Sequence, residues 1–287
     1  MEGNLFSGAS AFDSDLALER RRASTYVEGV DYKRDVCIGG VWERIKVKSA
    51  EGEKSIGRPM GLYDTLTLPP LDTIMPDDVE DAKDEIAREL CRMCDLCDVS
   101  PEKILVVGLG NRDLTPDAIG SNAAAEVEAT MHVKESDPEL FETLGCSEIA
   151  VLCPDVTSKS GMNSAEVVRG VVDAIAPTLV IAIDSLASRS RERLGNTVQV
   201  SSTGIIPGTG VGHGGEALTE ATLGVPVIAI GVPTVISAAS IQRELGNSGS
   251  KYDRDYFLSP KGINRIVKNA GKIIGGGINQ AFGICYF

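Results

Sequence analysis

Four short runs of branched apolar residues, separated by segments with helical spacing, constrain the fold of this chain more than any other feature. The runs are ILVVGLG, EIAVLCP, LVIAIDSLA and VPVIAIGVP, and the helical patterns cover residues 116–130, 164–176 and 235–245. Continuous Val, Ile and Leu strands are typical of a parallel sheet that is covered on both faces. The sequence therefore predicts an α/β fold with a mostly parallel, mixed sheet and helices on both faces.

The N-terminal part of the chain has a different pattern. Residues 36–69 read as strands, with VCIGGVWERIKVKS and LYDTLTLP on either side of a turn-forming AEGEKSIGRP. An amphipathic helix is predicted over residues 77–97, and a last helix in SPKGINRIVKNAGKIIGGGINQAF is weakened by its three consecutive glycines. We expect a mobile leader over residues 1–14 and a single α/β domain over 15–287, with a β-rich N-terminal elaboration.

Composition excludes several classes of function. The formal net charge of -13 argues against a nucleic-acid-binding protein, because phosphate binding needs clustered lysines and arginines. No apolar run approaches the roughly 20 residues that span a bilayer. The first residues lack the basic and then apolar pattern of a secretory signal. We therefore expect a cytoplasmic protein.

The cysteines invite a metal-site interpretation, which the spacing does not favour. Three of the seven cysteines lie in CRMCDLC, as Cys91, Cys94 and Cys97. Cys94 and Cys97 continue the apolar stripe of the predicted helix, and no fourth ligand lies nearby. We expect reduced thiols and no metal.

Two aspartates are the strongest candidates for chemistry. In open α/β sheets, catalytic groups gather beyond the carboxyl ends of the strands. Asp184 directly follows LVIAI, and Asp117 lies in the turn after ILVVGLG. Each has a structural alternative, because Asp184 could cap the next segment and Asp117 could sit in the first turn of a helix that Pro116 begins. Two carboxylates on neighbouring strands favour function.

Other kinds of site fit the sequence less well. The loop that starts at Gly108 has Asp113 where a dinucleotide fingerprint needs glycine, and it lacks the GK[ST] of a Walker loop. There is no GxSxG elbow, and His213 in the second glycine-rich stretch could be a functional or a surface residue. Two carboxyls can hydrolyse an amide when one activates water and the other donates a proton. The residues alone thus predict an acid-type hydrolase without a cofactor.

Three long motifs resemble a known family. GLGNRDLTPDAIG, VIAIDSLASRSRERLGNTVQVSSTGIIPGTGVGHG and ATLGVPVIAIGVPTVI are similar to the germination protease (spore protease) of endospore-forming bacteria. That family degrades the small acid-soluble proteins that coat spore DNA. With DSDLALE and EGEKSIGRPMGLYDTL, the resemblance spans roughly residues 15–239. It implies a phosphorylase/hydrolase-like fold and an atypical aspartic endopeptidase, with Asp117 and Asp184 as the catalytic pair.

The resemblance has further implications. It implies a zymogen with a short N-terminal propeptide, here the leader, and a homotetramer in the forespore or spore core. The substrates would be small acid-soluble spore proteins, with no direct contact to nucleic acid or membrane. Supporting or substrate-loop roles are predicted for Asn111, Ser185, Ser188, Arg189 and His213. Ordinary capping would explain Ser185, Ser188 and Arg189 equally well. Which aspartate is the base stays open, because a coupled pair titrates as a unit.

Some positions depart from the family pattern and keep alternatives open. The usual RTDLA is DSDLA here, Ile206 replaces the histidine of GIHPG, and His213 stands where asparagine is usual. The related hydrogenase-maturation endopeptidases, which bind nickel through carboxylates and a histidine, resemble residues 108–120 and are the nearest rival. A non-catalytic protein on the same fold is the second alternative.

Overall fold

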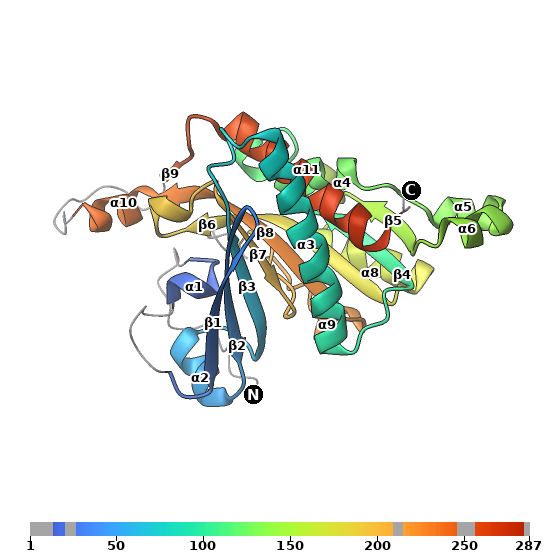
Figure 1. Ribbon diagram of the computed structural model, residues 1–287, viewed down its shortest axis with the longest axis horizontal. Helices are drawn as coiled ribbons and strands as arrows, with labels where there is room; N and C mark the ends of the chain where they lie inside the picture. The colour runs from blue at the N-terminus through green and yellow to red at the C-terminus, as the bar shows by residue number, and fades with distance from the viewer. Residues whose placement is uncertain (1–13, 21–26, 209–214, 246–255, 284–287) are drawn as a thin grey trace.

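The computed structural model describes residues 14–20, 27–208, 215–245 and 256–283. Within them, one mixed sheet runs through the molecule (Figure 1). Its strands are β1 (Val30–Cys37), β2 (Gly40–Val47), β3 (Gly61–Thr67), β4 (Lys103–Gly108), β5 (Glu148–Leu152), β6 (Leu179–Ser188), β7 (Thr197–Ser201), β8 (Val227–Ser237) and β9 (Phe257–Leu258). Their order is β1-β2-β3-β7-β8-β6-β4-β5, with β9 paired to β8. The predicted α/β class is confirmed.

The four apolar runs form the parallel part of the sheet, as predicted. β5, β4, β6 and β8 are neighbours in that order, and each adjacent pair is parallel. β4 is buried from both sides: Ile104 and Val106 belong to one buried cluster, and Leu105 and Val107 to another. This two-sided burial is the reason why the run contains no polar alternation.

The N-terminal elaboration is antiparallel and differs from the prediction in two places. Residues 36–49 are not one strand, because the chain turns back between β1 and β2, whose Cys37 and Gly40 pair with each other. The stretch read as a turn contains the helix α2 (Ala50–Ile56). The Ser49 side chain accepts a hydrogen bond from the Gly52 N–H, and Gly57 ends the helix in the left-handed conformation. The sequence reading overlooked this cap.

Helices cover both faces of the sheet (Figure 1). One face carries α3 (Pro76–Cys97), α4 (Ile119–Glu126) and α11 (Ile263–Phe282), and the other carries α8 (Ser164–Ile175). None of the helices in the described ranges is long and apolar enough to cross a membrane. The shorter helical segments are α1 (Ala17–Arg20), η1 (Thr115–Asp117), α5 (Met131–Ser136), α6 (Pro138–Leu144), α7 (Thr157–Ser160), η2 (Arg191–Arg193), α9 (Glu220–Leu223) and α10 (Ala238–Glu244).

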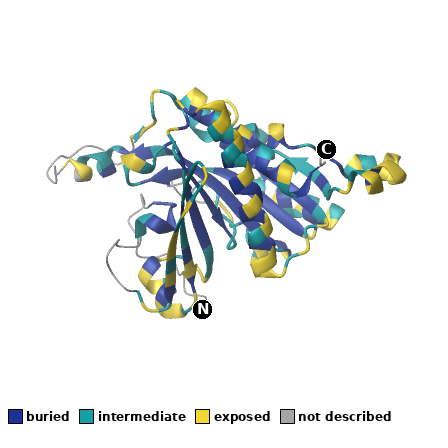
Figure 2. Ribbon diagram, viewed as in Figure 1, coloured by how far each residue is buried: buried dark blue, intermediate teal, exposed yellow. Residues whose placement is uncertain are grey.

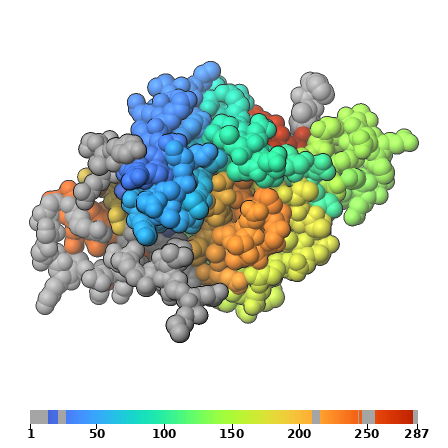
Figure 3. Space-filling view, turned by 90° about the horizontal axis from the view of Figure 1, so that it is seen from below, coloured from blue at the N-terminus to red at the C-terminus, as the bar shows by residue number. Residues whose placement is uncertain are grey.

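Burial follows this layering. The central strands are buried throughout, whereas α5 and α6 are largely exposed and project from one end of the molecule (Figures 2 and 3). In α3, Cys94 lies in the buried stripe as predicted, but Cys97 at the last position of the helix is exposed. The prediction for Cys97 was wrong because α3 ends there, so the stripe has nothing left to pack against.

The three consecutive glycines do not break the last helix. α11 continues through them because they lie where it crosses its neighbours. A Cβ added to Gly275 would stand 2.6 Å from the carbonyl oxygen of Ala123 in α4, and one on Gly277 would stand 2.7 Å from Cγ2 of Ile86 in α3. The low helix propensity of glycine is offset here by close packing of helix on helix.

The different surroundings of Gly275 and Gly276 predict different effects of an alanine substitution on stability. Gly275→Ala places its methyl group against the α4 backbone, so we expect the free energy of unfolding to fall by about 1–3 kcal/mol. In the matched control Gly276→Ala, the new Cβ meets only the flexible end of Lys83. We expect that variant to be neutral or more stable by up to about 1 kcal/mol. Urea unfolding measures both, and equal effects would contradict the packing account.

Candidate active site

The parallel strands β4 and β5 end next to each other, beside the middle of β6. The loop after β4 carries Asp117, the loop after β5 carries Asp155, and β6 carries Asp184. The prediction that Asp184 follows its strand was wrong. β6 continues to Ser188 because β8 runs on beside it, and Asp184 pairs with Gly231. Asp184 therefore lies within a strand of the sheet and not in a loop.

The glycine loop after β4 folds back on Asp117. Gly110 has φ +90, and a Cβ there would lie 2.1 Å from the carbonyl oxygen of Asp117. This close approach lets the backbone N–H of Asn111 donate to Oδ2 of Asp117 at 2.8 Å. In a phosphate-binding loop such an N–H group would donate to the ligand, whereas here it donates to the carboxylate of Asp117 in the same chain. The loop thus positions Asp117.

Asp184 is almost completely buried, with 4% of its surface exposed. Its Oδ1 accepts a hydrogen bond from the backbone N–H of Ser185 at 2.8 Å. The Ser185 hydroxyl in turn accepts from the N–H of Ile119, the first residue of α4, at 3.4 Å. Ser185 thereby links the Asp184 strand to the helix that directly follows Asp117.

The two carboxyls interact electrostatically. Burial raises the pKa of Asp184 well above its ordinary value, and the negative charges of Asp117 and Asp15 raise it further. Burial also raises the pKa of Asp117, while the Asn111 N–H lowers it and the charge of Asp155 raises it. Because Asp184 is the more buried of the two, it is the carboxyl that keeps its proton to higher pH.

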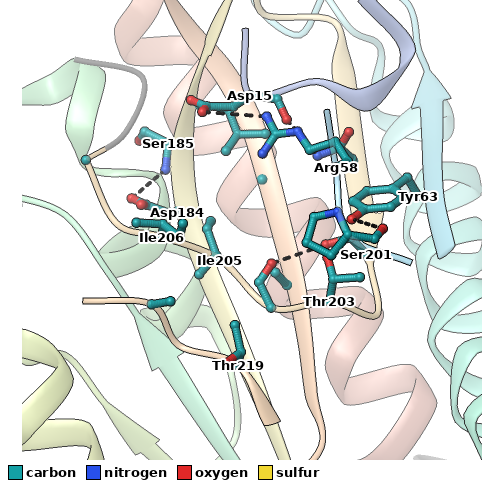
Figure 4. A pocket seen from close by; sticks show the side chains of 18 residues that line it. Asp15, Arg58, Tyr63, Asp184, Ser185, Ser201, Thr203, Ile205, Ile206 and Thr219 are labelled. Carbon is teal, nitrogen blue, oxygen red and sulfur yellow. Dashed lines mark hydrogen bonds and ion pairs between the residues drawn. The ribbon is translucent and has the colours of Figure 1, made fainter. Parts of the chain in front are cut away.

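A cavity of about 210 Å³ opens beside Asp184 (Figure 4). Asp184 and Ser185 form one side, and Tyr63 and Thr203 lie on the opposite side. Ile206, which takes the place of the usual histidine, also lines the cavity. Asp117 is not among the residues that line this cavity.

The N-terminal segment covers part of this cavity. Asp15 lines it and pairs with the end of β6: its N–H donates to the Ala187 oxygen at 3.0 Å, and its Oδ2 accepts from the Ala187 N–H at 2.9 Å. Arg58 donates to the carbonyl oxygen of Ser14 at 2.8 Å and lies 4.0 Å from Oδ1 of Asp15. Leu16 is fully buried. A stretch of polypeptide therefore already lies at the mouth of the site.

Two of the predicted supporting residues contact this segment and not the aspartates. The Ser188 hydroxyl donates to Oε1 of Glu19 at 2.6 Å, and the Arg189 N–H donates to Oε2 of Glu19 at 2.7 Å. The structure thus brings Asn111 and Ser185 to the aspartates, while Ser188 and Arg189 hold the N-terminal segment. His213 lies outside the described residues.

Sequence reasoning missed Asp155, Asp15 and Arg58. Asp155 could have been found, because it follows the apolar run EIAVLCP just as Asp117 follows its own. Asp15 and Arg58 reach the site only by tertiary packing, which no local pattern reveals. Within the described ranges, no group of three or more His, Cys, Asp or Glu side chains is arranged to hold a metal ion.

Comparison with known proteins gives the same family as the motifs. A family model described as germination protease (Peptidase_A25) matches residues 11–246. The germination protease of Caldanaerobacter subterraneus subsp. tengcongensis is 35% identical, with 93% of each chain covered. That of Clostridium perfringens (strain ATCC 13124) is 32% identical over 93% of this chain and 94% of its own.

Two further matches extend the comparison. The germination protease of Bacillus cytotoxicus is 37% identical over 80% of this chain and 65% of its own. Among solved structures, a [NiFe] hydrogenase maturation protease from Thermococcus kodakarensis matches with a TM-score of 0.36 and 18% identity, covering 64% of this chain and 99% of its own. The family model and the two relatives that match nearly end to end decide the assignment: this chain belongs to the germination protease family.

Proposed function

We propose that this chain is an aspartic-type endopeptidase that degrades small acid-soluble spore proteins during germination, with Asp117 and Asp184 as its catalytic pair. Family membership supports the peptidase activity. The observation that carries the assignment of the residues is the coupling of two carboxyls from neighbouring parallel strands, one of them buried in a cavity wall. Burial makes the ionised form of a carboxyl energetically unfavourable and so shifts its pKa. Carboxyls with shifted pKa values are typical of catalytic sites.

The burial of each carboxyl suggests its role. Asp117 acts as the base and takes a proton from water as the oxygen adds to the peptide carbonyl carbon. Asp184 acts as the acid and donates its proton to the carbonyl oxygen. When the tetrahedral intermediate collapses, the proton held by Asp117 passes to the leaving nitrogen and the C–N bond breaks. A hydroxyl proton of the intermediate returns to Asp184 as the carboxylic acid forms, so the pair regains its starting protonation states. Both carboxyls must have their correct protonation states, so activity is confined to pH values between the two apparent pKa values of the pair.

The N-terminal contacts support synthesis as a self-processing zymogen. Asp15 lines the cavity and is bonded to Ala187 through its N–H and its carboxylate, and Arg58 donates to the carbonyl oxygen of Ser14. The leader over residues 1–14 would therefore be joined directly to a segment that lines the cavity, within reach of the site of its own chain. We further propose, from the family, a homotetramer in the forespore or spore core.

Substitution of either aspartate tests the catalytic pair. We expect Asp117→Asn and Asp184→Asn each to lower the rate of cleavage of a small acid-soluble spore protein by at least about 100-fold. Asp113→Asn, in the same loop but with its side chain 70% exposed, is the matched control and should cleave normally. Full activity in either catalytic variant would refute the pair. Loss of wild-type activity with a chelator would favour the metal-dependent alternative.

Stability as a function of pH tests which carboxyl keeps its proton. The folded-state pKa of Asp184 is raised, so the folded protein binds more protons than the unfolded chain above about pH 4, and stability falls as pH rises towards that pKa. The slope from this group is at most about 1.4 kcal/mol per pH unit. Asp184→Asn removes it, so we expect this variant to be more stable than wild type near pH 7 and to differ less near pH 4. Urea unfolding across this range would show no such divergence if Asp184 were ionised in the folded state.

Mass spectrometry tests the processing. We expect the active wild-type protein to lack residues 1–14, and the Asp184→Asn chain to keep its original N-terminus in the same preparation. Active protein that still begins at Met1 would contradict the zymogen proposal. It would leave the catalytic pair unaffected, because that pair is tested by cleavage of an added substrate.

A further inference from the structure

A third carboxylate stands at the same edge of the sheet as the catalytic pair. β5 pairs with β4 in parallel, with Val107 opposite Leu152, so the ends of the two strands lie next to each other. Asp155 is in the loop after β5, as Asp117 is in the loop after β4. Its backbone has φ +61, a left-handed conformation that is uncommon for any residue with a side chain. Strained backbone of this kind is found preferentially at functional sites.

The carboxylate of Asp155 is fixed in place. Its Oδ1 accepts from the N–H of Val156 at 2.9 Å, and its Oδ2 lies 3.4 Å from Nζ of Lys159 in α7. The carbonyl oxygen of Asp155 accepts from the hydroxyl of Ser164 at 2.8 Å. The Val156 N–H first, and then Lys159 and Arg112, lower the pKa of Asp155, which is therefore ionised at neutral pH. Lys159 is also bonded to Asp113.

We propose that Asp155 is a positioning residue of the active site, whose fixed negative charge at the end of β5 sets the pH range in which Asp117 works as the base. The consequence for proteolysis rests on the proposed function, whereas the electrostatic effect on Asp117 does not. Asp155 does not touch the substrate in this proposal, since its oxygens are already engaged by Val156 and Lys159.

The groups around Asp117 explain why such a charge matters. From its own loop, the Asn111 N–H stabilises the ionised carboxylate and lowers its pKa. From β6, Asp184 interacts with Asp117 electrostatically, and burial first and then the charge of Asp117 raise the pKa of Asp184. From the β5 loop, Asp155 repels the charge of Asp117 and raises its pKa. A carboxylate with a lower pKa is a weaker base towards water, so Asp155 offsets the weakening effect of the hydrogen bond that positions Asp117.

Two substitutions and one control isolate the charge of Asp155. Asp155→Asn keeps an oxygen for the Val156 N–H and a side chain that tolerates the left-handed backbone, but it removes the charge. Asp155→Gly removes the charge and the backbone strain together. The control Asp113→Asn removes a negative charge that is also paired with Lys159. Asp113 is exposed and has no part in the site.

The first readout is the ¹³C carboxyl titration of Asp117 in the full chain labelled with ¹³C-aspartate, assigned by the signal lost in Asp117→Asn. The second readout is the acidic limb of the pH profile of kcat/KM. In Asp155→Asn and Asp155→Gly, we expect the midpoint of the Asp117 titration and the acidic limb to move to lower pH by on the order of 0.3–1 unit. Asp113→Asn should leave both unchanged.

Several results would overturn the inference. An unshifted Asp117 titration in Asp155→Asn would do so, and so would a loss of activity that is equal at every pH, because that pattern indicates a purely structural role. An equal shift in Asp113→Asn would assign the effect to the general charge of the loop. If the wild-type protein cleaved no substrate, the proposed function would fail, but the ¹³C titration would still decide the role of Asp155.

Discussion

The parallel pairing of β4 with β6 is the constraint on which the site depends. It places Gly108 opposite Ile183, so that the loop leaving β4 begins beside the residue that precedes Asp184. The segments that carry Asp117 and Asp184 are thereby brought to the same region of the sheet, and no long loop is needed to join them. The bond from Ile119 N–H to Ser185 strengthens the same junction from the helix that follows. Everything else in the site is arranged around this pair of strands.

The burial of Asp184 near a second carboxyl is destabilising, and the rest of the fold must offset this effect. A carboxyl that is almost fully buried beside a second carboxyl is destabilising whenever it ionises. The neighbouring strands are buried on both faces, and the apolar clusters under α3, α4, α11 and α8 supply the opposing stabilisation. The covering of both faces also keeps water away from the strands beside Asp184, and electrostatic interactions between carboxyls are stronger where water is excluded.

Much of this arrangement could be predicted from particular residues. The uninterrupted Val/Ile/Leu run of β4 identifies a strand with two covered faces, and the strand-end rule then leads to Asp117 and its neighbourhood. Asp155 obeys the same rule and was missed only because its run was not followed to the end. The helix α2 was missed because Ser49 lies just outside the stretch read as a turn. Arg58 and Asp15 could not have been found from local patterns, because tertiary packing brings them to the cavity from distant parts of the chain.

The burial of residues 14–20 has a consequence for the architecture of the N-terminus. Ala17 and Leu18 belong to a third apolar cluster with Ile45 and Tyr63, which is built on the antiparallel strands of the N-terminal elaboration. The same short segment thus lines the cavity with Asp15 and completes a small core with Ala17 and Leu18. A chain shortened to begin after Leu18 would lose both the part of the cavity wall that Asp15 forms and part of the N-terminal apolar cluster. Residues 15–18 therefore contribute to the cavity wall and to the N-terminal core together.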